Sequence, residues 1–517
     1  SESTHDLCRD HMPPLTQAKP LGAHGLKDVE RPEAVFQLSH PDLPQGFPPL
    51  RVEALPQDRD TPSIAVLPFV NMSRDEDNEY FADGLSEELL NVLAKIRGLR
   101  VASRTSAFSF KGKDVDIPTV ARKLNVATVL EGSVRKSGNR VRITAQLIEV
   151  ASDSHLWSET YDRQLDDIFA VQDDIAQSVV KELQVTLLGA HATSAEAVAE
   201  VRRAAKGRAD NPQAFQLYLQ GKFYGERATQ ADTDKAIALF HEALAIDPDF
   251  PLAWAGLSLV QQLQAGYGFA PIDKGYEDAR VAAQRALAMA PDLAEGHVAV
   301  GLIAQSYDRN WSAADASFRR ALELAPGDVR ALQAAAGLAR ILGRHQQAAD
   351  LVQQTVARDP LSARAHRLAG NIYLIGGDLE AAARAFAMAI DINPTGTLAY
   401  AFLAMARLLQ RRFDEALSLA ERETHDVFRN LALAVIHHAA GRVEQSALAS
   451  QALIDGFAWT AAYQVAEVCA YRGEIDKAFE WLETAFRQND PGVIYSGSDP
   501  LLAPLHDDPR WAAFIAR

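Results

Sequence analysis

The charged side chains that could perform chemistry gather in a few places along this sequence. The densest acidic group surrounds the start of a predicted helix, and it consists of Glu76, Asp77, Glu79, Asp83, Glu87 and Glu88. Carboxylates at this density could bind a divalent cation. Acids in the first turn of a helix also complement the positive end of its dipole, and Asp83 could cap it. We favour the second interpretation, so no metal site is predicted.

A basic group surrounds a predicted turn at 137–139 and contains Arg135, Lys136, Arg140 and Arg142. These cations could form an anion or RNA site. Sites for single-stranded RNA also interleave stacking aromatic side chains, and none stands between these cations. A solvated hairpin tip is therefore favoured. We likewise expect Lys27 and Asp28 to lie in a solvated turn.

Common catalytic and nucleotide-binding motifs are missing from the sequence. It contains no G-x-x-x-x-G-K-[ST] loop, no G-x-S-x-G turn and no H-E-x-x-H helix. His437 and His438 are adjacent, whereas two metal ligands on one helix face need a spacing of three or four. Neither Cys8 nor Cys469 belongs to a recognisable cysteine–histidine partner pattern, and Cys469 is expected to be a buried structural thiol. We predict no catalytic, cofactor-binding or metal-binding residue in this chain.

Composition limits the classes of protein that fit. The 517 residues carry a net charge of −16, which argues against a general nucleic-acid binder. Two distant cysteines make no disulfide framework and fit a reducing compartment. No apolar run reaches the length of a membrane-spanning helix, and no signal peptide is recognisable. We therefore predict a cytoplasmic protein, and its start at Ser1 suggests that an upstream part is missing.

The elements that position these residues fall into segments. Prolines at 40–51 predict a stiff linker over 39–61. Residues 62–190 predict an α/β domain. Its strands are expected at 63–69, 99–104, 127–136, 140–150 and 154–161, and its helices at 80–97, 117–125 and 165–187. Residues 191–210 are Ala-rich and charged, which predicts a second linker.

A repeat of helix pairs follows from residue 211. Five prolines recur at intervals of 43, 35, 34 and 34 residues, namely Pro248, Pro291, Pro326, Pro360 and Pro394. Twelve residues before each stands an alanine: Ala236, Ala279, Ala314, Ala348 and Ala382. Small residues at this position let two helices cross closely, and proline ends the second helix. The longest interval implies an insertion of about nine residues, which we place within 265–275.

This register is similar to the tetratricopeptide (TPR) pattern, whose period is near 34 residues. The similarity predicts an array over 211–496 of about eight helix pairs, the last three degenerate. Residues 497–517 resemble the capping helix that ends bacterial TPR arrays, with Trp511 and Phe514 covering the last repeat. The predicted fold class is a small mixed α/β sheet domain followed by an all-α solenoid.

TPR arrays use the first helix of each pair to line a concave, partner-binding face. On this geometry we predict a groove for a protein or peptide ligand, lined by Gln216, Gln220, Gln261, His297, Arg340, His366 and Arg407.

Residues 62–190 resemble the TolB-amino-terminal-like domain of bacterial multidomain regulators. The resemblance is carried by IAVLPFVNMS (64–73), EYFADGLSEEL (79–89), VASRTSAFSFKGK (101–113), VLEGSVRKSGNRVRITAQLIE (129–149) and HLWSETYDRQLDDIFAVQDDIA (155–176). In such regulators the domain lies between an output domain and a TPR array. The resemblance implies no particular ligand.

Residues 1–38 with the following linker resemble the end of a class III adenylate cyclase domain, on the segment LGAHGLKDVERPEAVFQLSHPDLPQGFPPLR (21–51). The two metal-binding aspartates and the asparagine–arginine pair of that family lie upstream of this tail. Since they have no counterpart here, no catalytic residue is carried over. A homodimer would form through the missing cyclase domain.

The sequence therefore favours a non-catalytic regulatory and scaffold region of a cyclase-like signalling protein, without nucleic-acid partners. Two alternatives stay open. The full-length parent could be an active adenylate cyclase that converts ATP to cyclic AMP, or the chain could belong to a TolB-like/TPR transcriptional regulator.

Overall fold

The computed structural model describes residues 17–24, 33–39, 62–73, 79–152, 154–164, 167–183, 201, 204, 211–225, 229–267, 269–396, 398–488 and 490–516. The chain divides into two compact units, Ser1–Thr61 and Pro62–Arg517. In the first, β1 (Gln17–His24) pairs antiparallel with β2 (Glu33–Ser39). Lys27, Asp28, Cys8 and most of the predicted 39–61 linker lie outside the described residues.

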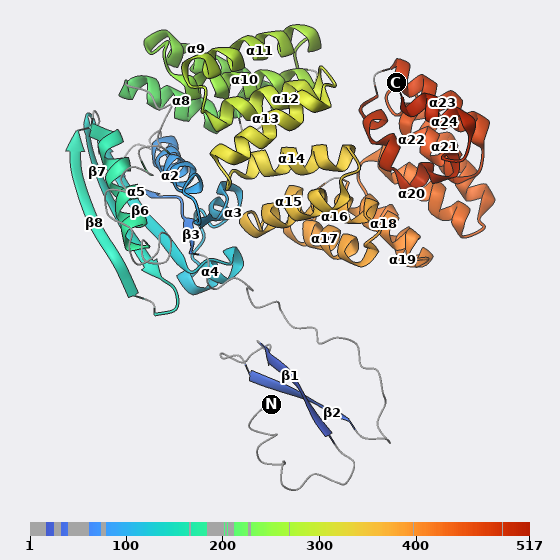
Figure 1. Ribbon diagram of the computed structural model, residues 1–517, viewed down its shortest axis with the longest axis horizontal. Coiled ribbons are helices and arrows are strands. Elements are labelled where there is room, and N and C mark those ends of the chain that lie inside the picture. The colour runs from blue at the N-terminus through green and yellow to red at the C-terminus, as the bar shows by residue number, and fades with distance from the viewer. Residues whose placement is uncertain are drawn as a thin grey trace. The chain divides into compact units, whose positions relative to one another are not determined.

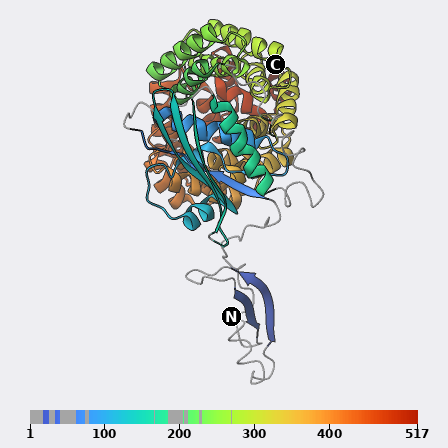
Figure 2. The same cartoon turned by 90° about the vertical axis from the view of Figure 1, so that its left-hand side faces the viewer.

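The second unit begins with a six-stranded mixed sheet, ordered β5-β3-β6-β7-β8 with β4 paired to β6. The strands are β3 (Ser63–Val66), β4 (Val70–Asn71), β5 (Arg100–Val101), β6 (Thr128–Ser137), β7 (Arg140–Glu149) and β8 (Ser154–Gln164). Strand β3 runs parallel to β5 and β6, whereas β6, β7 and β8 are antiparallel neighbours, and Figure 2 shows the strands side by side. Gly138 adopts a φ of 58° in the tight β6–β7 turn, where glycine costs little.

Among the residues described in this part of the chain, four helices accompany the sheet: α2 (Glu79–Ala94), α3 (Arg104–Phe108), α4 (Ile117–Leu124) and α5 (Ile168–Glu182). Apolar residues spaced along one face of α2, including Leu85, Leu89 and Leu93, are buried as their periodicity predicts. Asp83 does not cap α2 as predicted. It lies in the second turn of the helix, because α2 already begins at Glu79.

The rest of the unit is an array of eight antiparallel helix pairs among the described residues (Figure 1). The pairs are α8 (Pro212–Gly225) with α9 (Gln230–Ile246), α10 (Pro251–Gly266) with α11 (Ile272–Met289), α12 (Ala294–Ser306) with α13 (Trp311–Leu324), α14 (Val329–Ile341) with α15 (His345–Arg358), α16 (Ala363–Ile375) with α17 (Leu379–Ile392), α18 (Ala399–Leu409) with α19 (Phe413–Arg422), α20 (Asp426–Ala439) with α21 (Val443–Phe457), and α22 (Ala462–Tyr471) with α23 (Ile475–Arg487).

The predicted repeat register is confirmed. Helices α9, α11, α13, α15 and α17 each end two residues before their repeat proline. The five alanines that stand twelve residues before the prolines are at most 1% exposed. Gly301 and Gly370 lie against the rings of Phe318 and Phe386 within their own pairs, where a Cβ atom would not fit. The predicted fold class, a small mixed sheet followed by a helical array, is therefore observed.

The insertion in the second repeat enters mainly its helices. Helix α10 has three residues more than α14, and α11 has four more than α15. The connection 267–271 is two residues longer than 342–344. The extra residues therefore lengthen this pair instead of forming the single loop that we predicted within 265–275.

Three short helices end the chain: the 3-10 helices η4 (Pro491–Ser498) and η5 (Pro500–Leu505) and helix α24 (Pro509–Ile515). Phe514 is buried and forms ring contacts with Phe486 and with Trp511, which packs against the same cluster. Both aromatics thus pack on the last repeat, as predicted. The segment that carries them consists of three short helices and not of the one capping helix that we expected.

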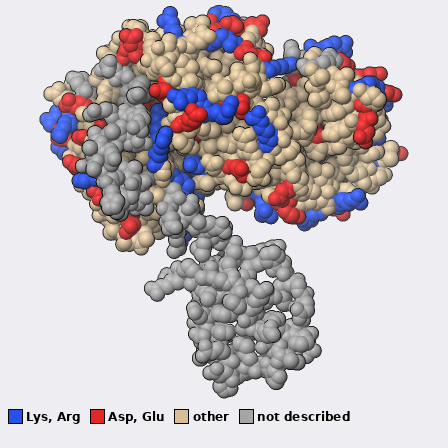
Figure 3. Space-filling model, in the orientation of Figure 1, with Lys and Arg blue, Asp and Glu red and all other residues tan. Residues whose placement is uncertain are grey.

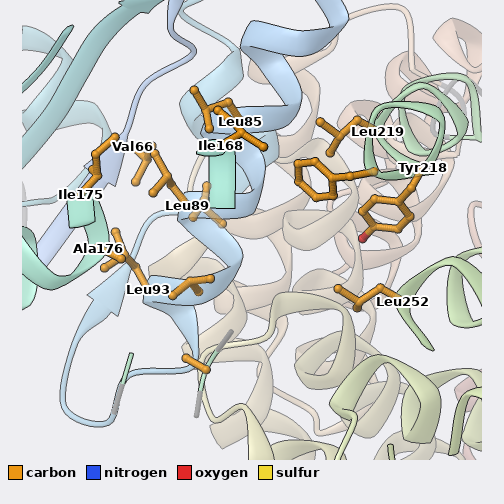
Figure 4. Close-up of a cluster of buried hydrophobic side chains, with 14 of the residues drawn as sticks. Val66, Leu85, Leu89, Leu93, Ile168, Ile175, Ala176, Tyr218, Leu219 and Leu252 are labelled. Carbon is orange, nitrogen blue, oxygen red and sulfur yellow. The ribbon is translucent and has the colours of Figure 1, made fainter. Parts of the chain in front are cut away.

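A single hydrophobic core joins the sheet domain to the start of the array. It contains Leu85 and Leu89 of α2 together with Tyr218 and Leu219 of α8 (Figure 4). A Cβ atom on Gly84 would lie 2.6 Å from Leu219, so glycine allows α2 and α8 to approach closely. Within the predicted linker at 191–210 only Val201 and Ala204 are described, and both side chains are buried in this core.

Candidate partner-binding cavity

A cavity of about 1380 Å³ lies on the inner side of the array. Its walls come from the first helix of every pair, from α2 and α3 of the sheet domain, and from the C-terminal segment that contains η4. The concave face of the array is therefore bounded by other parts of the same unit.

The cavity side chains of the inner helices follow one register. The residues that lie four, seven, eleven and fourteen positions after the repeat proline fall on one helical face. On α14 these are Arg330, Gln333, Gly337 and Arg340, and on α16 they are Arg364, Arg367, Asn371 and Leu374. The equivalent positions of α10, α12 and α18 that line the cavity are Leu252, Leu259, Gln262, Glu295, Val298, Leu302, Gln305, Leu398, Ala401 and Met405.

Of the seven predicted groove residues, Arg340 lines this cavity. His297 and His366 each place Nε2 2.8 Å from the carbonyl oxygen of their repeat proline, Pro291 and Pro360, and burial lowers the pKa of His366. Each of these two side chains therefore contacts the residues just before its own helix.

The remaining four groove residues have other surroundings. The Gln216 amide oxygen accepts from Lys136 Nζ of β6 at 3.2 Å, and Gln220 is on the same helix, α8. Arg407 donates to Gln410 at 2.7 Å and pairs with Glu415 of α19 at 3.6 Å. Gln261 shares the register position of Arg407, and its Oε1 is buried without a hydrogen-bond partner.

A one-residue error in helical phase explains this outcome. His297 and His366 lie six residues after their prolines, and Gln261 and Arg407 lie thirteen after theirs. The cavity positions are seven and fourteen, and one residue rotates a side chain by about 100° around a helix. Polar residues recur at position fourteen of three successive repeats, namely Gln262, Gln305 and Arg340, and this signal could have indicated the face that lines the cavity.

The acidic run on α2 forms much of the wall between the sheet domain and the array. Lys222 of α8 lies 2.6 Å from Glu87 and 3.0 Å from Glu88, and Arg104 of α3 also pairs with Glu87 at 2.7 Å. These cations lower the pKa of Glu87 although burial opposes them. Asp83 pairs instead with Lys111 at 2.6 Å. The run therefore joins α2 to other elements, a role that its sequence did not reveal.

A second contact joins α3 to the fourth and fifth pairs of the array. The Asp359 carboxylate, just after α15, accepts hydrogen bonds from the hydroxyls of Ser103 and Ser106, the latter at 2.7 Å. Lys95, which follows α2, pairs with Glu295 of α12 at 2.9 Å. The sheet domain thus contacts at least three separate inner positions of the array.

The C-terminal segment forms another wall of the cavity. The Arg340 guanidinium lies 4.0 Å from the centre of the Tyr495 ring in η4, a cation–π distance. Tyr463 donates to Asp499 at 2.8 Å, and burial together with Asp499 raises the pKa of Glu467 well above its ordinary value.

No helix among the described residues is long and apolar enough to cross a membrane. In the same part of the chain, no group of three or more His, Cys, Asp or Glu side chains is arranged to hold a metal ion. Cys469 is buried, and burial raises the pKa of its thiol to about 11.

Comparison with family models identifies the class of each part. Residues 338–397 match the tetratricopeptide repeat, and residues 59–178 match the second domain of HilA/YgeH-like transcriptional regulators. The sheet domain is thus similar to a domain of those regulators, and part of the helical array matches the TPR repeat. The TolB-like resemblance and the cyclase-like tail stay predictions.

A relative called "Putative adenylate cyclase 3", from Rhizobium meliloti (strain 1021), is 42% identical over 239 residues. The match covers 46% of this chain and 39% of the relative. Among solved structures, human IFIT1 is 15% identical with a TM-score of 0.39, covering 63% of this chain and 87% of that one. Pseudomonas aeruginosa pilF is 19% identical with a TM-score of 0.34, covering 40% and 91%.

Proposed function

We propose that this chain is the regulatory and scaffold region of a cyclase-like signalling protein, and that a protein or peptide partner binds in its cavity. The observation that carries the proposal is the cavity of about 1380 Å³ lined by the first helix of every repeat. Small-molecule pockets are usually about 300–1,000 Å³, so this volume favours a peptide-sized occupant. The cyclase-named relative supports the signalling context.

In this proposal the sheet domain and the array act together. The contacts of α2 and α3 with the inner face mean that an occupant of the cavity would touch both parts. Binding could therefore shift the position of the sheet domain, and the segment before residue 62 would carry the change to an upstream cyclase domain. Cytoplasmic location, and dimerisation through that upstream domain, belong to the same proposal.

The proposal is tested by filling the cavity. Gly337 on α14 lines it, and a Cβ atom there would meet open space, so Gly337→Trp should occupy the cavity without disturbing helix packing. Gly456 on the exposed outer helix α21 is also surrounded by open space, which makes Gly456→Trp the matched control. We expect a partner captured by the wild-type chain to be lost with Gly337→Trp and retained with Gly456→Trp, at equal melting temperatures. Equal capture by both variants would refute the proposal.

A second candidate function is favoured by the match of residues 59–178 to a domain of transcriptional regulators. On this alternative the upstream part would bind DNA and not synthesise cyclic AMP. The full-length protein distinguishes the two. Formation of cyclic AMP from ATP supports the cyclase parent, whereas sequence-specific gel shifts without cyclase activity support the regulator.

A further inference from the structure

Four arginine side chains that line the cavity have no acidic partner. They are Arg330, Arg340, Arg364 and Arg367, and no carboxylate of the described residues lies within 4.0 Å of them. Arg340 Nε is also buried without a hydrogen-bond partner. Burial and the neighbouring Arg364 lower the pKa of Arg367. Arg330, Arg364 and Arg367 lie near the starts of the two neighbouring helices α14 and α16, and Arg340 lies in the last turn of α14.

Several arginines elsewhere in the array are paired across successive repeats. Arg280 lies 2.7 Å from Asp308, Arg344 lies 2.9 Å from Asp315, and Arg442 lies 3.4 Å from Asp414. Figure 3 shows the same mixture of basic and acidic side chains at the molecular surface. The four arginines that line the cavity lack such ion pairs within the described residues.

The acids that line the same cavity have their direct contacts with other groups, so none of them forms an ion pair with the four arginines. Glu295 pairs with Lys95, and Glu87 pairs with Lys222. Four others accept hydrogen bonds from backbone amides or hydroxyls, namely Asp328 from Ala331, Asp359 from Ser103 and Ser106, Asp490 from Tyr463 and Gly492, and Asp499 from Leu501. The pKa of the seventh acid, Glu467, is raised by burial and by Asp499. Arg330, Arg364 and Arg367 therefore gather at the starts of α14 and α16 without a carboxylate of the described residues within 4.0 Å.

The arrangement of the four arginines indicates the form of the ligand. Arg330 and Arg364 occupy the same register position in neighbouring repeats. Packed helices lie about 8–10 Å apart, and an extended peptide advances about 3.3 Å per residue, so acids about three residues apart would match them. The neighbouring inner helices present apolar side chains to the cavity, including Val298, Leu302 and Met405.

We propose that the cavity binds an acidic peptide segment of a partner protein, whose carboxylates pair with Arg330, Arg364 and Arg367 and whose apolar flanks contact the neighbouring inner helices. Arg340, held against Tyr495, supplies a fourth cation. This inference rests on the proposed function of the cavity. It adds the chemical class of the partner and the residues that select it.

The test uses the full chain and a fluorescein-labelled twelve-residue peptide with glutamate at every third position and leucine on both flanks. We expect this peptide to bind at least tenfold more tightly than the same peptide with glutamine for glutamate, and more weakly at high salt. The double variant Arg330→Gln/Arg364→Gln should lose at least tenfold in affinity. The outer-surface control Arg344→Gln/Arg442→Gln should bind as the wild type does.

Equal affinity for the glutamate and glutamine peptides, or an unchanged affinity in the cavity double variant, would overturn the inference. Displacement of the glutamate peptide by an equal concentration of ATP would also overturn the inference. If Gly337→Trp abolishes capture of a partner while Arg330→Gln/Arg364→Gln leaves it unchanged, the proposed function stands and this inference fails. If Gly337→Trp changes neither the capture of a partner nor the binding of the peptide, the proposed function and this inference both fail.

Discussion

The carboxyl group of Glu467 on α22 illustrates how burial decides the state of a single residue. Its side chain is almost fully buried, and Oε2 has no hydrogen-bond partner. Burial is the main cause of its raised pKa, and the nearby Asp499 adds to it. The folded chain therefore holds a proton on Glu467 at pH values where the unfolded chain has released it.

We predict that Glu467→Gln stabilises the protein at neutral pH by about 1 kcal/mol or more, since each pKa unit between the folded and unfolded states is worth about 1.4 kcal/mol. The folded pKa is raised, so the wild type loses stability as pH rises above the ordinary value of 4.5. The glutamine variant cannot ionise and should lack this loss. Melting temperatures measured between pH 4 and pH 8 by circular dichroism should diverge only at the higher values.

The control for this prediction is Glu444→Gln on the exposed side of α21, which should leave the pH profile unchanged. An identical slope of melting temperature against pH in Glu467→Gln and wild type would show that Glu467 is ionised in the folded chain.

The elements of the array depend on the small residues at which two helices cross. Ala382 of α17 is fully buried, and Phe386, one turn further along the same helix, fills the space opposite Gly370 of α16. A larger side chain at position 382 would have to enter the buried cluster that also contains Leu374 and Leu403.

We predict that Ala382→Trp lowers the free energy of unfolding by about 1–3 kcal/mol or more, the usual cost of overpacking. The exposed Ala447 on α21 provides the control, since Ala447→Trp adds the same side chain without entering the core. Urea denaturation of both variants measures the difference. A midpoint for Ala382→Trp equal to that of Ala447→Trp would contradict the register.

Sequence periodicity predicted these elements well, for a physical reason. The repeat prolines and crossing alanines are local requirements, so they recur in the sequence wherever a pair forms. The direction in which the inner helices face is set by neighbouring pairs, and there the prediction for His297, His366, Gln261 and Arg407 missed by one position. Lys222 of α8, the partner of Glu87 and Glu88, lies more than a hundred positions from them, and no local sequence pattern indicates such a contact.

At the scale of the whole unit, Lys222 joins the sheet domain to the array. Its ammonium group lies between Glu87 and Glu88, and the Glu88 side chain is only 3% exposed. We predict that Lys222→Met destabilises the chain by about 3 kcal/mol, because it leaves a buried carboxylate without its counter-charge. The measurement is chemical denaturation followed by two probes, one in the sheet and one in the array.

Lys477→Met is the control, since Lys477 is 67% exposed in its pair with Glu474 and such pairs contribute at most about 1 kcal/mol. A loss in Lys222→Met no larger than that of the control would mean that the ion pairs do not couple the two parts. Because one hydrophobic core spans both, we expect the two probes to unfold together in the wild type.

The close packing of Gly84 against Leu219 has a consequence for the time course of synthesis. The two residues are 135 positions apart, so α2 leaves the ribosome long before α8 exists. Ribosomes add about 5–20 residues per second, and the interval is therefore roughly ten seconds. During that time the nascent sheet domain exposes the apolar side of α2. Its early residues must avoid aggregation, or be held by a chaperone, until the middle of the chain is translated.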